Sequence, residues 1–279
     1  MPDNKKCIVV TGGASGLGLG TVRSFAEQGH HICVLDISEQ GAVVETLSSE
    51  YPQASFTFHQ ANIADWDELA KVFEQIYSAQ RRIDIVVANA GVSKETKITI
   101  EEDRPSKPRL PSLEINLIGT IYTVKLATHY MKKNKIVNGP GKFSRGSIIC
   151  TASIAALYPF PVAPLYAASK HGVLGFVRSV AGQLEKEAIQ INAVAPAFIK
   201  TNISNNASDQ SVFDKMVMTP ISTFTRAVRQ VVADRVSSGQ VVVAHGDNVT
   251  TIPSPPVVDE ATSRNLEVLW SSGITPASA

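Results

Sequence analysis

Tyr166 and Lys170 are the two residues whose type and spacing point most directly to chemistry. They lie four residues apart in the run YAASK at 166–170, so a helix would place both side chains on one face, one turn apart. A free tyrosine has a pKa of about 10, too high for an efficient base at neutral pH, but a nearby ammonium stabilises the phenolate. The pair can therefore exchange a proton with a substrate hydroxyl. The alternative is an ordinary tyrosine–lysine pair on a helix surface.

Ser153 ends the apolar run 147–153, and its hydroxyl is suited to hydrogen-bond a substrate oxygen and the Tyr166 hydroxyl. Such a contact would hold the reacting carbon in place while Tyr166 acts as acid or base. Serine also ends strands simply as a turn former, and this is the alternative for Ser153.

A glycine cluster, TGGASGLG at 11–18, follows the first apolar run and opens a helix. Gly12, Gly16 and Gly18 would let the backbone turn tightly, approach a pyrophosphate and pack the helix on the sheet. The helix N-terminus adds N–H donors and the positive end of the helix dipole. Because a plain strand–helix turn also uses glycine, the cluster alone is a weak indication of a dinucleotide site.

Asp36 ends the second apolar run, about twenty residues after the glycine cluster. A carboxylate there can hydrogen-bond both hydroxyls of an adenosine ribose and repels a 2′-phosphate, which favours NAD over NADP. The alternative is that Asp36 caps a helix starting near Ser38. We place Ile37 at the same end of the site, with Asn62 and Ile63, whose side-chain amide and backbone N–H can reach an adenine ring.

Two kinds of element alternate along the chain and would position these residues. Short apolar runs typical of strands occur at 7–10, 31–36, 55–60, 83–90, 147–153, 190–196 and 240–246. Stretches with helical period lie between them, at 16–28, 39–50, 66–79, 112–133, 166–187 and 226–237. The alternation predicts a Rossmann-type, doubly wound α/β domain spanning 1–279, with a mainly parallel seven-stranded sheet and helices on both faces.

Two irregular stretches, 93–111 and 199–225, follow strands and are therefore expected to reach a site at the carboxyl ends of the sheet. Together with 154–164 they offer an apolar lining that suits a hydrophobic alcohol or ketone: Leu157, Tyr158, Phe160, Ile203, Phe213, Met216, Met218 and Phe224. The same side chains could equally pack in a lid or in the core. A third stretch, 132–146, precedes a strand, so we expect it at the edge of the sheet opposite to the site.

The composition excludes several kinds of partner. The chain has 279 residues, a formal net charge of +1 and 44% hydrophobic residues, and we expect neither a nucleic-acid nor a membrane partner. The first apolar run is too short for a signal-peptide core or a membrane span, which predicts a cytoplasmic protein. Cys7, Cys33 and Cys150 lack metal-ligand spacing and lie in predicted strands, so we expect no metal site and reduced core cysteines.

Together these motifs resemble the short-chain dehydrogenase/reductase family. The glycine cluster, the Asn-Ala-Gly run at 89–91, Asn116, Ser153 and YAASK occur in the family's order, and the resemblance covers nearly the whole chain. It implies that Asn116 holds a water linking Lys170 to solvent. It also implies a set of cofactor-binding residues: Gly12, Ser15, Gly16, Leu17, Gly18, Asn89, Ala90, Gly91, Tyr166, Lys170, Pro196, Ile199 and Thr201.

Pro196, Ile199 and Thr201 match the family segment that meets the nicotinamide amide, but Ala197 stands where many members have glycine. The local conformation of this loop is therefore an open point. The chain as a whole is similar to fungal members from secondary-metabolite pathways and to 15-hydroxyprostaglandin-dehydrogenase-like members.

The resulting prediction is an NAD-dependent oxidoreductase that transfers hydride between NAD and a hydrophobic secondary alcohol or ketone, with Tyr166 as general acid/base. One alternative is a ketone reductase or a cofactor-assisted isomerase or cyclase on the same scaffold. Another is a non-catalytic dinucleotide-binding protein, which the intact set of Asn116, Ser153, Tyr166 and Lys170 disfavours.

Assembly and the C-terminal tail complete the expectations. Helix 166–187 carries apolar or small residues around most of its circumference, which, with the family's usual assembly, predicts a homodimer or homotetramer. The tail 247–279 contains a short amphipathic segment ending at Trp270, which would either pack over a neighbouring subunit or be partly disordered.

Overall fold

The computed structural model describes residues 5–38, 42–96, 98, 104, 106–136, 143, 145–201 and 215–271. Within them one sheet of eight strands has the order β3-β2-β1-β4-β5-β6-β7-β8. Its first seven strands are parallel, and β8 pairs antiparallel with β7. Their bounds are β1 Cys7–Thr11, β2 His31–Asp36, β3 Ser55–Gln60, β4 Ile85–Ala88, β5 Gly146–Thr151, β6 Ile189–Pro196, β7 Val241–His245 and β8 Asn248–Ile252. The predicted fold class is confirmed, with one more strand than predicted.

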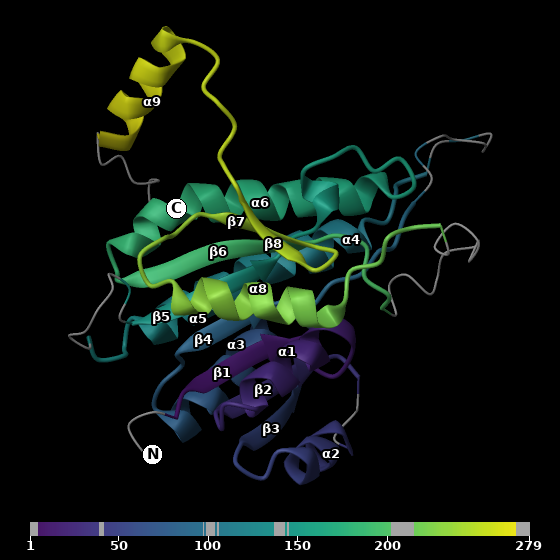
Figure 1. Cartoon of the computed structure of the whole chain (residues 1–279), viewed down its shortest axis with the longest axis vertical. Coiled ribbons are helices and arrows are strands. Elements are labelled where there is room, and N and C mark those ends of the chain that lie inside the picture. The colour runs from purple at the N-terminus through teal and green to yellow at the C-terminus, as the bar shows by residue number, and fades with distance from the viewer. Residues whose placement is uncertain are drawn as a thin grey trace.

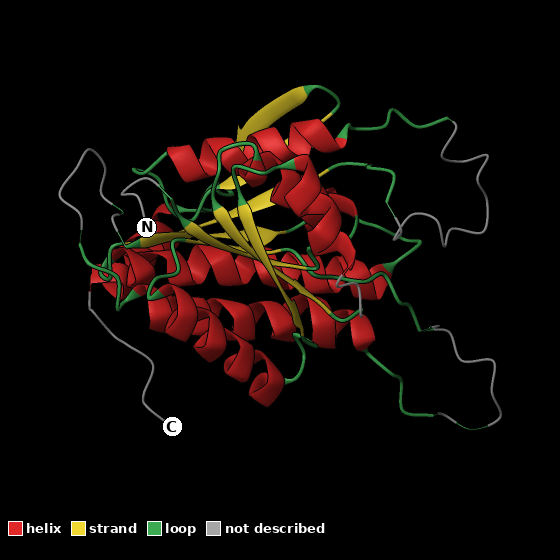
Figure 2. Ribbon diagram, turned by 90° about the horizontal axis from the view of Figure 1, so that it is seen from below, coloured by secondary structure: helices red, strands yellow, loops and turns green. Residues whose placement is uncertain are grey.

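Helices cover both faces of the sheet, as Figure 2 shows. They are α1 Gly16–Ala26, α2 Ala42–Glu50, α3 Trp66–Gln80, α4 Pro111–Leu113, α5 Thr120–Met131, α6 Pro164–Glu185, α8 Ile221–Ala233 and α9 Glu260–Ser271. A π-helical turn, η1 Glu114–Gly119, joins α4 to α5, and a 3-10 turn, η2 Ile154–Ala156, follows β5.

Alternate residues of the strands pack into two separate apolar cores, one on each face of the sheet. In β1, Cys7 and Val9 belong to the core beneath α3, α5 and α6, whereas Ile8 and Val10 belong to the core beneath α1 and α8. Both faces of each central strand are therefore buried, which explains why these strands read as unbroken apolar runs. The three cysteines are free and buried in β1, β2 and β5.

The C-terminal part of the chain differs most from the prediction. The tail begins with β8, which β7 reaches through a two-residue turn at Gly246 and Asp247; Gly246 has a φ of +49°. Glycine followed by aspartate is a hairpin signal that the helix–strand alternation obscured. The predicted amphipathic segment is α9, which has no buried residue and stands apart from the rest of the described chain in Figure 1.

Helix α8 starts five residues earlier than predicted, at Ile221 rather than 226. The predicted substrate loop 199–225 is thus helical at its end. Phe224 is fully buried in the core beneath α1 and α8, so its predicted role as a substrate contact is wrong. None of the helices in the described segments is long and apolar enough to cross a bilayer, and these segments hold no cluster of three or more potential metal-ligating side chains.

Candidate active site

The carboxyl ends of β1, β4 and β5 are tied together by Asn89. Its Nδ2 donates to the Thr11 carbonyl at 3.1 Å, and its Oδ1 accepts from the Thr151 hydroxyl at 3.3 Å. The Thr11 hydroxyl in turn accepts from the backbone N–H groups of Asn89 and Ala90, at 3.0 and 3.1 Å. These bonds fix the edge of the sheet at which ligands of open α/β folds bind. Sequence reasoning did not assign Thr11 and Thr151 to the site.

The glycine cluster packs so closely against the rest of the chain that no side chain fits at Gly12 or Gly18. Gly12 has a φ of +63°, and a Cβ on it would lie 2.9 Å from the Cα of Ala90. A Cβ on Gly18 would lie 1.9 Å from the Gly12 carbonyl oxygen. Gly16, with a φ of +51°, opens α1 just after Ser15 and just before Leu17. This turn at a helix N-terminus has the form of a phosphate cradle.

Asp36 lies beside this cluster and holds it to β2. Its Oδ2 accepts from the backbone N–H of Ala14 at 3.1 Å, and its Oδ1 accepts from the Ser38 N–H and hydroxyl at 3.1 and 2.9 Å. The nearest described helix, α2, begins at Ala42. Asp36 therefore closes a local turn with Ser38; the alternative, a cap on a helix starting near Ser38, falls on residues 39–41, which lie outside the described residues.

The residues predicted for the adenine end have different environments. Ile37, next to Asp36, is 64% exposed and offers a free apolar surface. The Asn62 Oδ1 accepts from the Ala64 N–H at 3.1 Å in a local turn. The side chain of Ile63 is buried and fills the space above Gly119. Only the backbone of Ile63 is therefore left for a ligand.

The segment after β6 lies over the glycine cluster. Pro196 ends β6, Ile199 is buried, and a Cβ on Gly16 would lie 3.6 Å from the Thr201 Cβ. The Ala197 N–H donates to the Ala244 carbonyl at 2.8 Å. Ala197 is not among the residues with positive φ. Alanine therefore fits the loop conformation at this position.

Lys170 is buried at the centre of the candidate site. Its Nζ donates to the Thr151 carbonyl at 2.7 Å and lies 5.7 Å from the centre of the Tyr166 ring. Burial lowers the pKa of Lys170 to about 8, and the nearby Cys150 opposes this in part. A Cβ on Gly91 would lie 3.0 Å from the Asn116 Oδ1, which is tighter than an ordinary contact, and 3.6 Å from Nζ.

Tyr166 and Ser153 interact across the site. Burial raises the pKa of Tyr166, and the interaction with Ser153 opposes that rise. The expected lowering of the tyrosine pKa is therefore not seen in the protein alone, because desolvation outweighs the effect of Ser153. Ser153 also has the turn-forming role: its Oγ accepts from the Ala155 N–H at 3.1 Å and caps η2.

Asn116 lies in the π-helical turn η1, where sequence reasoning expected a regular helix. Its Oδ1 accepts from the Val92 N–H at 2.8 Å, and its Nδ2 donates to the Val92 carbonyl at 2.8 Å and to the Ser169 hydroxyl at 3.0 Å. The side chain thus joins the segment after β4 to α6. Both amide hydrogens of Asn116 are thus used within the protein. The water expected next to Lys170 remains a prediction.

The apolar residues expected to line a substrate site have different environments. Phe160 lies with its ring centre 6.4 Å from that of Tyr166 and 6.2 Å from that of Phe198, a residue not predicted for the site. Tyr158 is 62% exposed, whereas Leu157 packs on the core. Met216 and Met218 are half-buried, and Ile203 and Phe213 lie outside the described residues.

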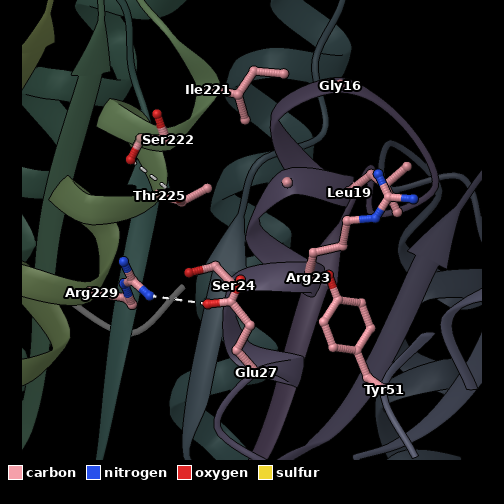
Figure 3. A pocket seen from close by; sticks show the side chains of 11 residues that line it. Gly16, Leu19, Arg23, Ser24, Glu27, Tyr51, Ile221, Ser222, Thr225 and Arg229 are labelled. Carbon is pink, nitrogen blue, oxygen red and sulfur yellow. Dashed lines mark hydrogen bonds and ion pairs between the residues drawn. The ribbon is translucent and has the colours of Figure 1, made fainter. Parts of the chain in front are cut away.

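A groove between α1 and α8, with a volume of about 480 Å³, adjoins the glycine cluster at Gly16 (Figure 3). Two arginines border it, and each pairs with a glutamate: Arg23 with Glu50 at 3.3 Å, and Arg229 with Glu27 at 3.5 Å. The four predicted catalytic residues do not line this groove. It is therefore separate from the cluster around Tyr166.

Comparison with known proteins matches residues 6–212 to the family model described as short chain dehydrogenase. A short-chain dehydrogenase/reductase, prx7, of Penicillium rubens is 34% identical over 226 residues, covering 77% of this chain and 76% of its own. The NAD(+)-type 15-hydroxyprostaglandin dehydrogenase of Rattus norvegicus is 33% identical over 204 residues, covering 72% of this chain and 70% of its own. The chain belongs to the short-chain dehydrogenase family.

A solved structure of ElxO with NADP bound supports the fold at a TM-score of 0.73. It is 25% identical and covers 87% of this chain and 98% of ElxO. In a short-chain dehydrogenase the cleft around the glycine cluster holds a nicotinamide nucleotide, and the residues here fit that group. Gly12 and Gly16 have positive φ and form the tight turn that opens α1, whose first N–H groups suit a pyrophosphate, and Asp36 carries acceptors suited to ribose hydroxyls.

Proposed function

We propose that this short-chain dehydrogenase is NAD-dependent and transfers hydride between NAD and a hydrophobic secondary alcohol or ketone. The observation that carries the proposal is the joining of Tyr166, Ser153 and the buried Lys170 at the carboxyl end of β5, beside the glycine cluster. A bound nicotinamide would supply the hydride acceptor or donor. The chain would hold the substrate oxygen and move its proton.

Each of the three side chains has a separate task. As a phenolate, Tyr166 accepts the proton of the substrate alcohol, and as a phenol it donates this proton to the carbonyl oxygen in the reverse direction. The Ser153 hydroxyl, which interacts with Tyr166, orients the substrate oxygen. The Lys170 ammonium, held by the Thr151 carbonyl, supplies the positive charge that favours the phenolate.

The preference for NAD rests on Asp36. Its carboxylate lies at the end of β2, next to the glycine cluster, and would repel the 2′-phosphate of NADP. The rat relative carries NAD(+) in its name, whereas ElxO was solved with NADP. The charge at position 36 is therefore the feature to test.

We expect Asp36→Asn to weaken NAD binding about tenfold, since a hydrogen bond to a charged group contributes about 1.5–3 kcal/mol, and to strengthen NADP binding. Asparagine retains a side-chain oxygen for the Ala14 N–H, so the glycine cluster keeps its tie to β2. Titration calorimetry with both nucleotides measures the change. Tighter binding of NADP than NAD by the wild type would refute the assignment.

The proposed substrate class rests on the rings near Tyr166. Phe160 and Phe198 form an apolar wall beside the tyrosine, and the half-buried Met218 belongs to the segment next to them. Such a wall favours an apolar group on the carbon that carries the reacting oxygen. Absorbance of NADH with a panel of secondary alcohols and ketones tests the function directly.

Reduction of a ketone is a second candidate, and one observation favours it. Because burial raises the pKa of Tyr166, the phenol is protonated at neutral pH in the protein alone. This is the form that donates a proton to a carbonyl oxygen. Measuring kcat/KM in both directions for one alcohol–ketone pair distinguishes the two candidates.

We also expect a homodimer or homotetramer in the cytoplasm. The outer side of α6 carries small residues, and the positions above Gly175 and Gly182 are open, with nothing within 4 Å of a Cβ built there. A second copy could approach this surface closely. Light scattering after size-exclusion chromatography at micromolar concentration should give a multiple of 29.9 kDa; a monomer mass would contradict the prediction.

A further inference from the structure

The N-terminus of α6, the helix that carries Tyr166, has no cap of its own. Its N-cap position is Ala163, whose side chain cannot accept a hydrogen bond, and Pro164 at the first helical position has no N–H. The first N–H groups that need a partner are therefore those of Leu165 and Tyr166. Uncapped, this first turn would fray.

Glu95 supplies both missing acceptors from the segment after β4. Its Oε2 accepts from the Leu165 N–H at 2.9 Å, and its Oε1 accepts from the Tyr166 N–H at 2.8 Å. Both carboxylate oxygens are thus used on consecutive N–H groups, at the positive end of the helix dipole. The cap comes from 70 residues earlier in the chain.

The chain on either side of Glu95 is itself fixed. The Lys94 N–H donates to the Ser112 hydroxyl at 2.9 Å, and that hydroxyl donates to the Lys94 carbonyl at 2.6 Å. The Thr96 hydroxyl donates to the Arg109 carbonyl at 2.6 Å. Glu95 therefore ties α6 to a segment that is itself held by hydrogen bonds to Arg109 and Ser112.

We propose that Glu95 is a positioning residue, which fixes the first turn of α6 so that the Tyr166 hydroxyl stays in register with Ser153. This inference rests on the proposed role of Tyr166. The hydroxyl lies at the far end of a long side chain, so a small rotation of the turn displaces it, and a displacement of about 1 Å can lower a rate about 100-fold. Glu95 acts only through the backbone and touches no reacting atom.

The test compares Glu95→Ala, which removes both acceptors, with Glu95→Gln, which retains one oxygen acceptor. Glu74→Ala removes an exposed carboxylate from α3 and serves as the matched control. Amide hydrogen exchange of Leu165 and Tyr166, kcat and the dissociation constant of NADH are measured for all four proteins. The pKa of Tyr166 is measured by difference absorbance against Tyr166→Phe.

In Glu95→Ala we expect faster exchange of these two amides, a kcat roughly 10–100-fold lower and unchanged NADH binding. The pKa of Tyr166 should fall toward its ordinary value of about 10, as the turn opens to solvent. Glu95→Gln should lie between Glu95→Ala and the wild type, and Glu74→Ala should match the wild type.

Unchanged exchange of the two amides in Glu95→Ala would overturn the cap. Faster exchange with unaltered kcat and Tyr166 pKa would overturn the positioning role. A wild type that transfers no hydride would instead refute the proposed function, and amide exchange and the tyrosine titration would still decide this inference.

Discussion

Replacing Tyr166 with phenylalanine should lower kcat by about 10²–10⁴-fold, the usual contribution of a positioned acid/base. The variant loses one hydroxyl, while the ring contact with Phe160 and the bond from Lys170 to the Thr151 carbonyl remain possible. We therefore expect its folding and its NADH affinity to match those of the wild type. Initial rates from NADH absorbance, with a secondary alcohol found active on the wild type, give the ratio.

Tyr158→Phe is the matched control for this prediction. Tyr158 lies in the same segment of chain and is 62% exposed, so removing its hydroxyl should leave kcat unchanged. If Tyr166→Phe retained wild-type kcat, the acid/base role would belong to another group.

Lys170 should make the stability of the protein depend on pH in a defined direction. Its pKa falls from 10.5 in the unfolded chain to about 8 in the folded protein because burial penalises the ammonium. Between these values the unfolded chain binds a proton that the folded protein lacks, so the free energy of unfolding rises with pH. The shift corresponds to about 3 kcal/mol.

Urea unfolding of the wild type and of Lys170→Met at pH 8 and pH 10.5 measures this effect. Relative to the variant, the wild type should gain about 3 kcal/mol between the two pH values. In this difference, the contributions of groups that titrate equally in both proteins to the free energy of unfolding cancel. Lys71→Met, which removes an exposed lysine from α3, should show no such difference; an equal response of both variants would mean that Lys170 is not desolvated.

Much of the fold could be predicted because its signals are local. Strands buried on both faces, such as β1 and β4, appear as short apolar runs, and the glycine cluster marks the first strand–helix turn. The order of motifs also predicted the family. Four site residues could be placed from such signals: Asp36 ends β2, Ser153 follows β5 by two residues, and Tyr166 and Lys170 lie one helical turn apart on α6.

What could not be predicted depends on contacts between distant parts of the chain. The sequence around Asn116 gave no sign of a π-helical turn. The Asn116 side chain bonds to the backbone of Val92 and to the hydroxyl of Ser169, which are both far from it in the sequence. Glu95 looked like one charge in a polar loop, and its role appears only when β4 and α6 are brought together. Phe224 looked like a ligand contact because the start of α8 was placed too late.

The two edge strands of the sheet have a consequence for how copies of the chain could associate. β3 carries Ser55, Thr57, His59 and Gln60, and β8 carries Asn248, Thr250 and Thr251. Polar, partly solvated edges discourage the addition of a strand from another molecule. Association should then occur through helix surfaces related by a rotation axis, which gives closed particles of fixed size and disfavours open-ended filaments.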